Sequence, residues 1–441
     1  MHDPGLIFLI CLVLSSSVFL LTLLSTNAAI IFLIFSMLLS PEIGFGPVQP
    51  DRAVVIRFDD LLLAIVFITW LAKLAINKQL GVLRSTPMNA PLGFFLASCM
   101  ASTAWGILNG TVASPLASAF YFVKYFEYFF LFFMVANVVQ ERWQIEMFLK
   151  AMLATLVCVC LYAYWQMVSG AVMRVTAPFE GVHAEPNTLA GYLLVMIAIC
   201  AGLLIQATSN RQRLLYAGAI VLAVLPFMYT YSRGGYIAFI AMYLTLCLAS
   251  DRYRLLLWAL LVVGILMIPM VAPQTVIHRI AETFDPRSSV QLGGMRLSES
   301  PAYRVMVWKI VFEKWLEHPL LGFGVTGLRI LADNQHALVL GELGLVGVIA
   351  YLWVRWRLAA ISYRISRTAK DQLDKGLALG FLAALMGLII LSFAANIFII
   401  VRIMEPFWFL AALVVVLPQL APAAPPVPQA APAGARRLVP A

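Results

Sequence analysis

The stretch PNTLAGYLLVMIAICAGLLIQ, residues 186–206, decides the fold class of this chain. It carries no charged residue and is long enough to cross the hydrocarbon core of a bilayer as a helix. Runs of this kind recur along the chain, and the cost of unpaired backbone groups inside a bilayer requires each of them to be helical. Hydrophobic residues make up 62% of the 441 residues and charged residues only 12%, which excludes a water-soluble globular protein. The sequence therefore predicts an all-α polytopic membrane protein.

The apolar runs predict about twelve transmembrane helices. They fall near residues 5–25, 28–45, 59–76, 90–107, 117–138, 147–169, 186–206, 213–231, 235–250, 254–271, 337–354, 376–396 and 406–420. The first run has no basic region before it and no cleavage pattern after it, so we expect a retained helix. Whether the first two runs make one crossing or two is open, because no basic residue flanks them.

Arginine and lysine residues between the runs orient the helices, because loops rich in these residues stay in the cytoplasm. The basic loops contain Lys78, Arg84, Arg142, Lys150, Arg211, Arg213, Arg252, Arg254, Arg355, Arg357, Arg364, Arg367 and Lys370. The alternating segments are then periplasmic, namely 46–58, 108–116, 170–185, 232–234, 272–336 and 397–405. This bias accounts for the net charge of +9, so we expect no nucleic-acid partner.

Two segments differ from the apolar runs. The long periplasmic loop 272–336 contains YRVMVWKIVFEKWL (303–316), whose apolar and charged residues alternate at helical spacing and predict a helix along the membrane surface. Residues 421–441 are rich in proline and alanine and cannot build a core. We expect one transmembrane domain, residues 1–420, followed by a disordered cytoplasmic tail, residues 421–441.

Conspicuous polar residues collect in the segments predicted to be periplasmic. Arg233 gives the strongest signal, because it lies in the tight turn YSRGGY (231–236) between two apolar runs. A guanidinium is costly there unless an anion or a polar cavity receives it, although it can also reach the lipid headgroups. Arg174 and Arg304 are predicted either to bind the same anion or to be ordinary surface charges.

A histidine and its polar neighbours open the apolar run that starts near residue 337. His336 can accept a proton from an attacking hydroxyl if it is desolvated, and a headgroup contact is the alternative. Asp333 can orient His336 or act as the base itself, while helix capping by Asp333 or Asn334 competes with both roles. Glu342 lies deeper in the run and needs a partner if it is ionised, so a structural and a functional role are both open.

Several arginines with one base suit a departing diphosphate. Arginine presents a planar fork of donors that matches phosphate and keeps its charge in a partly dry site. The base would deprotonate a sugar hydroxyl while the arginines stabilise the leaving group. We expect no metal and no cofactor. The pair Asp59–Asp60 is a weak cation site, explained more simply by charge at a helix N-terminus, and the six cysteines read as buried apolar residues.

Four stretches of the chain resemble the O-antigen ligase and O-antigen polymerase superfamily, membrane glycosyltransferases of the C type that use undecaprenyl-diphosphate-linked glycans. They are RVTAPFEGVHAEPNTLAGYL (174–193), YSRGGYIAF (231–239), YRVMVWKIVFEKWLEHPLLGFGVTGL (303–328) and DNQHALVLGELGLVGVIAYL (333–352). The resemblance implies that Arg233, together with Arg174 and Arg304, contacts the lipid diphosphate. It also implies a loop histidine near the acceptor and a reaction without a metal.

Asn187 and Asn334, in the first and last of these stretches, are predicted to bind substrate. The chain departs from the family pattern at one point. Many members read His-Asn where this chain reads Asp333-Asn334, and the histidine follows at position 336. Either His336 or Asp333 is therefore the predicted base.

The resemblance implies an O-antigen ligase in the bacterial inner membrane with its active site facing the periplasm. The donor would be an undecaprenyl-diphosphate-linked glycan and the acceptor the lipid A–core oligosaccharide. A polymerase of the same family, which uses a second lipid-linked unit as the acceptor, is the alternative. A transporter of lipid-linked saccharides would need charges buried midway through the bilayer and symmetry between halves, and neither is evident in the sequence.

Overall fold

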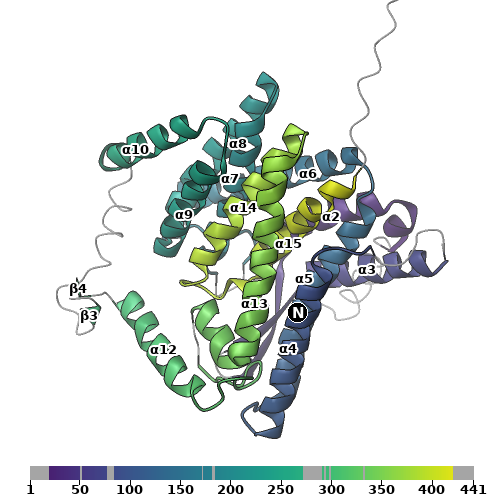
Figure 1. Cartoon of the computed structure of the whole chain (residues 1–441), viewed down its shortest axis with the longest axis vertical. Helices are drawn as coiled ribbons and strands as arrows, with labels where there is room; N and C mark the ends of the chain where they lie inside the picture. The colour runs from purple at the N-terminus through teal and green to yellow at the C-terminus, as the bar shows by residue number, and fades with distance from the viewer. Residues whose placement is uncertain are drawn as a thin grey trace, which may run out of the picture.

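The computed structural model describes residues 19–420, apart from 50–51, 77–83, 171, 181–183, 272–290, 293–294, 297–298 and 331–332. The predicted tail, residues 421–441, and most of the first apolar run lie outside the described residues. The described chain is predominantly helical, as expected (Figure 1).

The helices and strands keep the chain order of the sequence. The helices are α2 (Thr26–Leu39), α3 (Phe58–Ile76), α4 (Asn89–Leu108), α5 (Pro115–Val138), α6 (Arg142–Ser169), α7 (Pro186–Gln206), α8 (Asn210–Tyr229), α9 (Arg233–Ala249), α10 (Arg254–Val271), α12 (Glu299–Trp315), α13 (Gln335–Thr368), α14 (Gln372–Leu391) and α15 (Val401–Val416). Short 3-10 helices lie at Ile397–Ile399 and Leu417–Gln419. The strands are β1 (Glu42–Gln49), β2 (Arg52–Arg57), β3 (Gln291–Leu292) and β4 (Met295–Arg296).

Within the described residues, eight helices are long and apolar enough to cross a membrane. They are α4, α5, α6, α7, α8, α13, α14 and the continuous helix formed by α15 with the 3-10 turn after it. Three shorter apolar helices accompany them, namely α2, α9 and α10. A multi-pass membrane protein is therefore confirmed, whereas the total of about twelve crossings stays a prediction.

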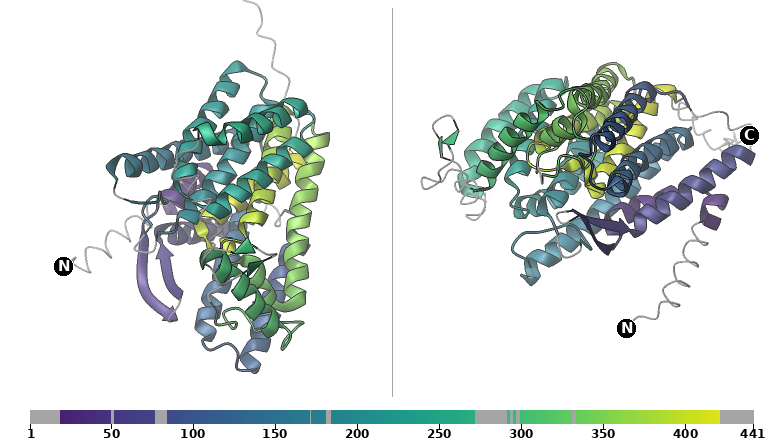
Figure 2. Two further views of the ribbon diagram at one scale, coloured as in Figure 1. Left: turned by 90° about the vertical axis from the view of Figure 1, so that its left-hand side faces the viewer. Right: turned by 90° about the horizontal axis from the view of Figure 1, so that it is seen from below.

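The second apolar run is shorter as a helix than the sequence predicts. Helix α2 ends at Leu39, and residues 42–49 form β1, which pairs antiparallel with β2 at the edge of the bundle (Figure 2). Pro41 follows the C-cap residue Ser40 directly and cannot continue the helix. The predicted periplasmic segment 46–58 is therefore mostly a β-hairpin.

Helices α7, α14 and α15 form the centre of the bundle. Gly202 of α7 faces Gly376 and Gly380 of α14 so closely that a Cβ on Gly202 would lie 2.3 Å from the Gly376 carbonyl oxygen. Such close approach of small residues is a common way for helices to associate in membranes. All sixteen residues of α15 are buried.

Segments predicted to share a side of the membrane contact one another. Thr111 donates to the Phe323 carbonyl over 2.6 Å, and Arg402 donates to the Phe179 carbonyl over 3.2 Å. At the other end, Arg142 lies 2.9 Å from Asp374. These contacts group the loops as the alternation of basic segments predicted. We call the end with segments 108–114, 172–180, 184–185, 230–232, 319–330, 333–334 and 392–400 the site face.

Helix α13 is broken where the sequence suggests one continuous apolar helix. Gly344 has a φ of 62°, and a Cβ there would lie 2.5 Å from the Leu320 carbonyl oxygen. The amides of Leu345 and Val346 donate to the carbonyls of Pro319 and Leu320 over 2.9 and 3.1 Å. The chain at 319–324 thus satisfies the backbone groups that the break exposes, as buried irregular backbone requires.

Candidate functional site

The turn after α14, residues 392–396, is the centre of the site face, and we call it the α14 turn. Asn334 donates to the Phe393 carbonyl over 3.0 Å, and Arg304 donates to the Ala394 carbonyl over 3.2 Å. A Cβ on Gly234 would lie only 2.4 Å from the Cβ of Ala394, so the start of α9 packs directly on this turn. The α14 turn therefore brings together three of the four stretches that carry the family resemblance.

Arg304 reaches the α14 turn from α12. The buried residues Val307 and Val311, one and two helical turns further along, pack against Leu328 and Leu338. Arg304 lies on the same face of the helix because residues three and four apart share a face. Its Nε is buried and has no hydrogen-bond partner among the described residues. Burial lowers the pKa of Arg304, and the nearby carboxylates of Asp333 and Glu185 oppose that effect.

Arg174 lies beside the turn that precedes Arg233. Its Nε donates to the Thr230 carbonyl over 2.9 Å, and one terminal nitrogen lies 3.3 Å from the Tyr231 carbonyl. Arg233 is the first residue of α9, and Ser232 caps that helix by accepting from the Gly235 amide. Two of the three predicted arginines are therefore held at one place by local backbone contacts.

Asn187 connects this turn to the start of α7. Its Oδ1 accepts from the Ser232 hydroxyl and its Nδ2 donates to Glu185, both over 2.7 Å. The sequence analysis expected Asn187 to bind substrate. The structure gives it a supporting contact to the residue before Arg233, and its role toward substrate stays a prediction.

Glu185 is a polar member of the site that the sequence analysis did not single out. Burial raises its pKa, the hydrogen bond from Asn187 opposes this, Asp333 raises it further, and Arg174 and Arg304 lower it. Two arginines and one other carboxylate thus interact electrostatically with Glu185. The only signal in the sequence was its place beside Pro186 and Asn187 in the stretch 174–193.

Asn334 caps α13, which was the competing interpretation of this residue. Its Oδ1 accepts from the amides of His336 and Ala337 over 3.0 and 3.1 Å. Asn334 is 1% exposed and also donates to the α14 turn, so its side-chain groups serve the fold. Asp333, in contrast, is exposed and lies within electrostatic reach of Arg304 and Glu185.

His336 packs against the α14 turn through Phe393. Its ring centroid lies 4.3 Å from that of Phe393 and 5.8 Å from that of Tyr351. Its Nε2 lies 3.1 Å from the Ile389 carbonyl oxygen. A carbonyl only accepts, so Nε2 carries the hydrogen and Nδ1 keeps the lone pair in the neutral ring.

Arg355 corrects the sequence interpretation. It was grouped with the cytoplasmic basic residues, but it lies within α13 and is 6% exposed. Its guanidinium carbon lies 3.5 Å from the centroid of the Tyr351 ring, and one nitrogen lies 3.3 Å from the Ser392 hydroxyl. A charge therefore lies inside the bundle, against the Tyr351 ring that His336 also contacts. The sequence did not reveal this position of Arg355, because a basic cluster follows Arg355 directly at positions 357–370.

Glu342 has a structural partner. Its Oε1 accepts from the Thr326 amide over 3.0 Å, and it is 3% exposed. Thr326 has a φ of 66°, so this contact helps to hold a strained loop residue in place. The structure therefore gives Glu342 a role in fixing the segment 319–328 against the broken helix α13.

The arrangement is that of a multi-pass membrane protein with arginines, carboxylates and a histidine gathered on one face. Residues 218–352, which include α9, α12 and the first half of α13, match the model of a family described as O-Antigen ligase. The resemblance predicted from the sequence is therefore confirmed over this segment.

A curated relative agrees with this match. The chain is 24% identical over 276 residues to a protein of Rickettsia felis named "Putative polysaccharide ligase". The matched part covers 60% of this chain and 63% of the relative.

Proposed function

We propose that this protein is an O-antigen ligase. It would transfer a glycan en bloc from undecaprenyl diphosphate to the lipid A–core oligosaccharide, at the periplasmic face of the bacterial inner membrane. The acceptor hydroxyl oxygen forms a bond to the anomeric carbon, the bond from that carbon to the diphosphate oxygen breaks, and the diphosphate departs on its lipid.

The main support is the electrostatic cluster on the site face. Arg174 and Arg304 interact with Glu185, Asp333 interacts with Glu185 and Arg304, and Arg233 comes directly after the residue that Asn187 holds. Arginine forks match the oxygens of a diphosphate and stabilise the charge that develops as it departs. The cluster is therefore assigned to the leaving group of the donor.

The proton of the acceptor hydroxyl goes to His336 in this proposal. Nδ1 keeps the lone pair because Nε2 faces a carbonyl oxygen. The choice of His336 rather than Asp333 rests on this fixed orientation, which a general base requires. Asp333, close to Arg304, would orient the arginines and the incoming sugar.

A reconstituted transfer assay tests the function. Purified protein is incubated with an undecaprenyl-diphosphate glycan and, in separate reactions, with lipid A–core or with a second lipid-linked unit. The proposal requires glycosylated lipid A–core as the product. A longer lipid-linked glycan would identify a polymerase instead. If neither acceptor gives a product, and transfer is restored only when the partner enzymes of a transport pathway are added, the protein is not the enzyme.

A further inference from the structure

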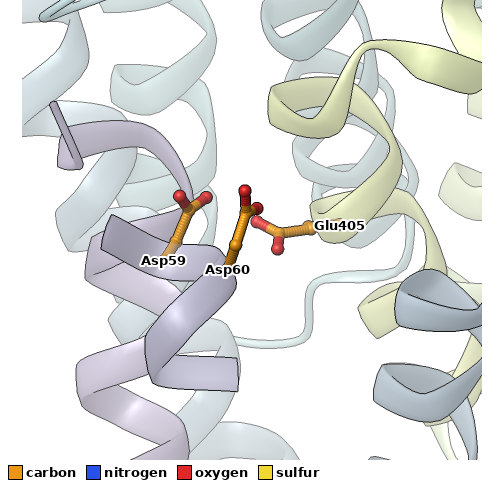
Figure 3. A group of neighbouring side chains, drawn as sticks. All are labelled: Asp59, Asp60 and Glu405. Carbon is orange, nitrogen blue, oxygen red and sulfur yellow. The ribbon is translucent and has the colours of Figure 1, made fainter. Parts of the chain in front are cut away.

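A buried cluster of carboxylates joins α3 to α15. Asp59 and Asp60 lie in the first turn of α3, where the sequence analysis expected them to provide helix N-terminal charge. Glu405 of α15 points toward them (Figure 3), and one oxygen from each of the three side chains lies within 4.8 Å of the others. Asp59 and Glu405 are both 0% exposed.

The cluster carries more negative than positive charge. Lys124 lies 2.6 Å from an Asp60 oxygen and 3.0 Å from a Glu127 oxygen. Arg57 lies 3.5 Å from an Asp59 oxygen. Glu405 has no ion pair among the described residues. If all side chains are ionised, four carboxylates face two cations, and a surplus of two negative charges is not tolerated in a dry interior.

The hydrogen bonds of the cluster are incomplete as well. Six buried carboxylate oxygens have no donor within the described chain; they belong to Asp59, Asp60, Glu127 and Glu405. Two protons would balance the charge, but each joins only two oxygens, so they would engage at most four of the six. The Tyr128 hydroxyl is also fully buried without a hydrogen-bond partner in the described chain, and it interacts electrostatically with Glu405 and Asp60.

We infer that Asp59, Asp60 and Glu405 form a binding site for a hard divalent cation of the calcium class, with the Tyr128 hydroxyl as a neutral fourth ligand. Calcium takes six to eight oxygen ligands at about 2.3–2.6 Å, so opposite ligands lie about 4.6–5.2 Å apart. The three carboxylate oxygens, all within 4.8 Å of one another, are close enough together to contact one such ion. A divalent cation also removes the surplus of two negative charges, while Arg57 and Lys124 keep their ion pairs at the rim.

A cavity lies beside the cluster. It has a volume of about 210 Å³ and is lined by Arg57, Lys124, Glu180, Thr188 and the chain at 399–402. Arg57 and Lys124 form the shared wall between this cavity and the carboxylates. The cation would tie the start of α3 to α15, so its role is structural and independent of glycan transfer.

Equilibrium dialysis with radioactive calcium and thermal unfolding test the site in the purified full-length protein. We expect one calcium ion per chain and a Tm that rises with the logarithm of calcium concentration relative to EDTA. Glu405→Gln keeps the shape of the side chain but removes a charge, so it should weaken binding by roughly tenfold or more. Glu146→Gln, which changes an exposed carboxylate of α6, should bind calcium like the wild type.

Dialysis of the wild type decides the outcome whether or not the variants fold. If the wild type binds no calcium and its Tm does not shift with calcium, the proposed site is wrong. Protons shared between the carboxylates would then explain how the cluster balances its charge. Calcium bound as tightly by Glu405→Gln as by the wild type would also overturn it. Glu405→Asp, which keeps the charge on a shorter side chain, serves as the binding variant if Glu405→Gln does not fold.

Discussion

The Ser232 hydroxyl donates a 2.7 Å hydrogen bond to Oδ1 of Asn187, across 45 residues of sequence. The same hydroxyl oxygen accepts from the Gly235 amide and caps α9. The backbone that carries Arg233 is therefore fixed at once by its own helix and by the start of α7. Asn187 also donates to Glu185. The side-chain amide of Asn187 therefore connects the Glu185 carboxylate to the turn that precedes Arg233.

Removal of the Arg233 guanidinium should abolish most of the activity. Arg233→Ala is expected to lower the rate of glycan transfer by about 100-fold or more, the usual loss for one donor to a developing anion. Arg233→Lys should recover only part of it, because an ammonium lacks the planar fork. Initial rates with purified protein provide the measurement, and Arg211→Ala, at the opposite end of α8, is the control. Wild-type rates in Arg233→Ala would remove this residue from the site.

His336→Gln should reduce transfer by about 10²–10⁴-fold, the range for loss of a general base. Asp333→Asn should cost less, because Asp333 is placed by charge rather than by a fixed hydrogen bond. Single-turnover rates of the two variants, compared at one pH, give the ranking. A larger loss in Asp333→Asn would assign the base to Asp333.

Asn187 and Ser232 should act as a pair. Asn187→Ala and Ser232→Ala are each expected to lower the free energy of unfolding by about 1 kcal/mol. The double variant should lose less than the sum, because both changes remove the same hydrogen bond. Chemical denaturation in detergent measures the cycle, and strictly additive losses would mean that the bond contributes nothing.

Glu185 should give the folded protein a pH dependence. Its pKa is raised above the ordinary 4.5, chiefly by burial, so the folded state binds this proton more tightly than the unfolded state. The associated stability is fully present below about pH 4.5 and is lost as pH rises through the folded pKa. The Tm of Glu185→Gln relative to wild type should therefore rise between pH 4 and pH 7. A difference that stays constant over this range would contradict the shift, and Glu146→Gln should follow the wild type.

Two glycines offer a matched test of the break in α13. Gly344→Ala should destabilise the protein by about 1–3 kcal/mol, because a Cβ meets the Leu320 carbonyl and the φ of 62° is strained for alanine. Gly218 lies inside α8, and a Cβ there would meet no atom within 4 Å. Gly218→Ala should be neutral or stabilising by up to about 1 kcal/mol. Equal Tm values for both variants would show that the break carries no constraint.

The sequence predicted correctly the features that a bilayer, acting as the solvent, imposes on a chain. A run such as 186–206 must be helical because its backbone has no other hydrogen-bond partners. The basic loops also predicted which connections share a side of the membrane, and that assignment stays a prediction. Arg174, Arg233 and Arg304 could therefore be placed on one face before any contact was known. The stretches around Arg233 and Arg304 also carried the family resemblance, which the match over residues 218–352 confirmed.

The break at Gly344 and the β-hairpin were missed for a local reason. Hydrophobicity alone does not separate a continuous helix from one interrupted by a residue with positive φ, and the hairpin residues 42–45 read as the end of an apolar run. The sequence also left two roles open for Asn334. The structure shows capping, which depends on where α13 begins rather than on residue type.

The residue pattern was sufficient to establish a helical membrane protein and the family it resembles. The three-dimensional arrangement was needed to show that Arg304 meets the α14 turn, that Arg355 lies inside the bundle and that Glu405 faces Asp59. These pairings depend on how closely helices approach one another, as at Gly202 and Gly376, and that distance is set by side-chain packing between segments far apart in the chain.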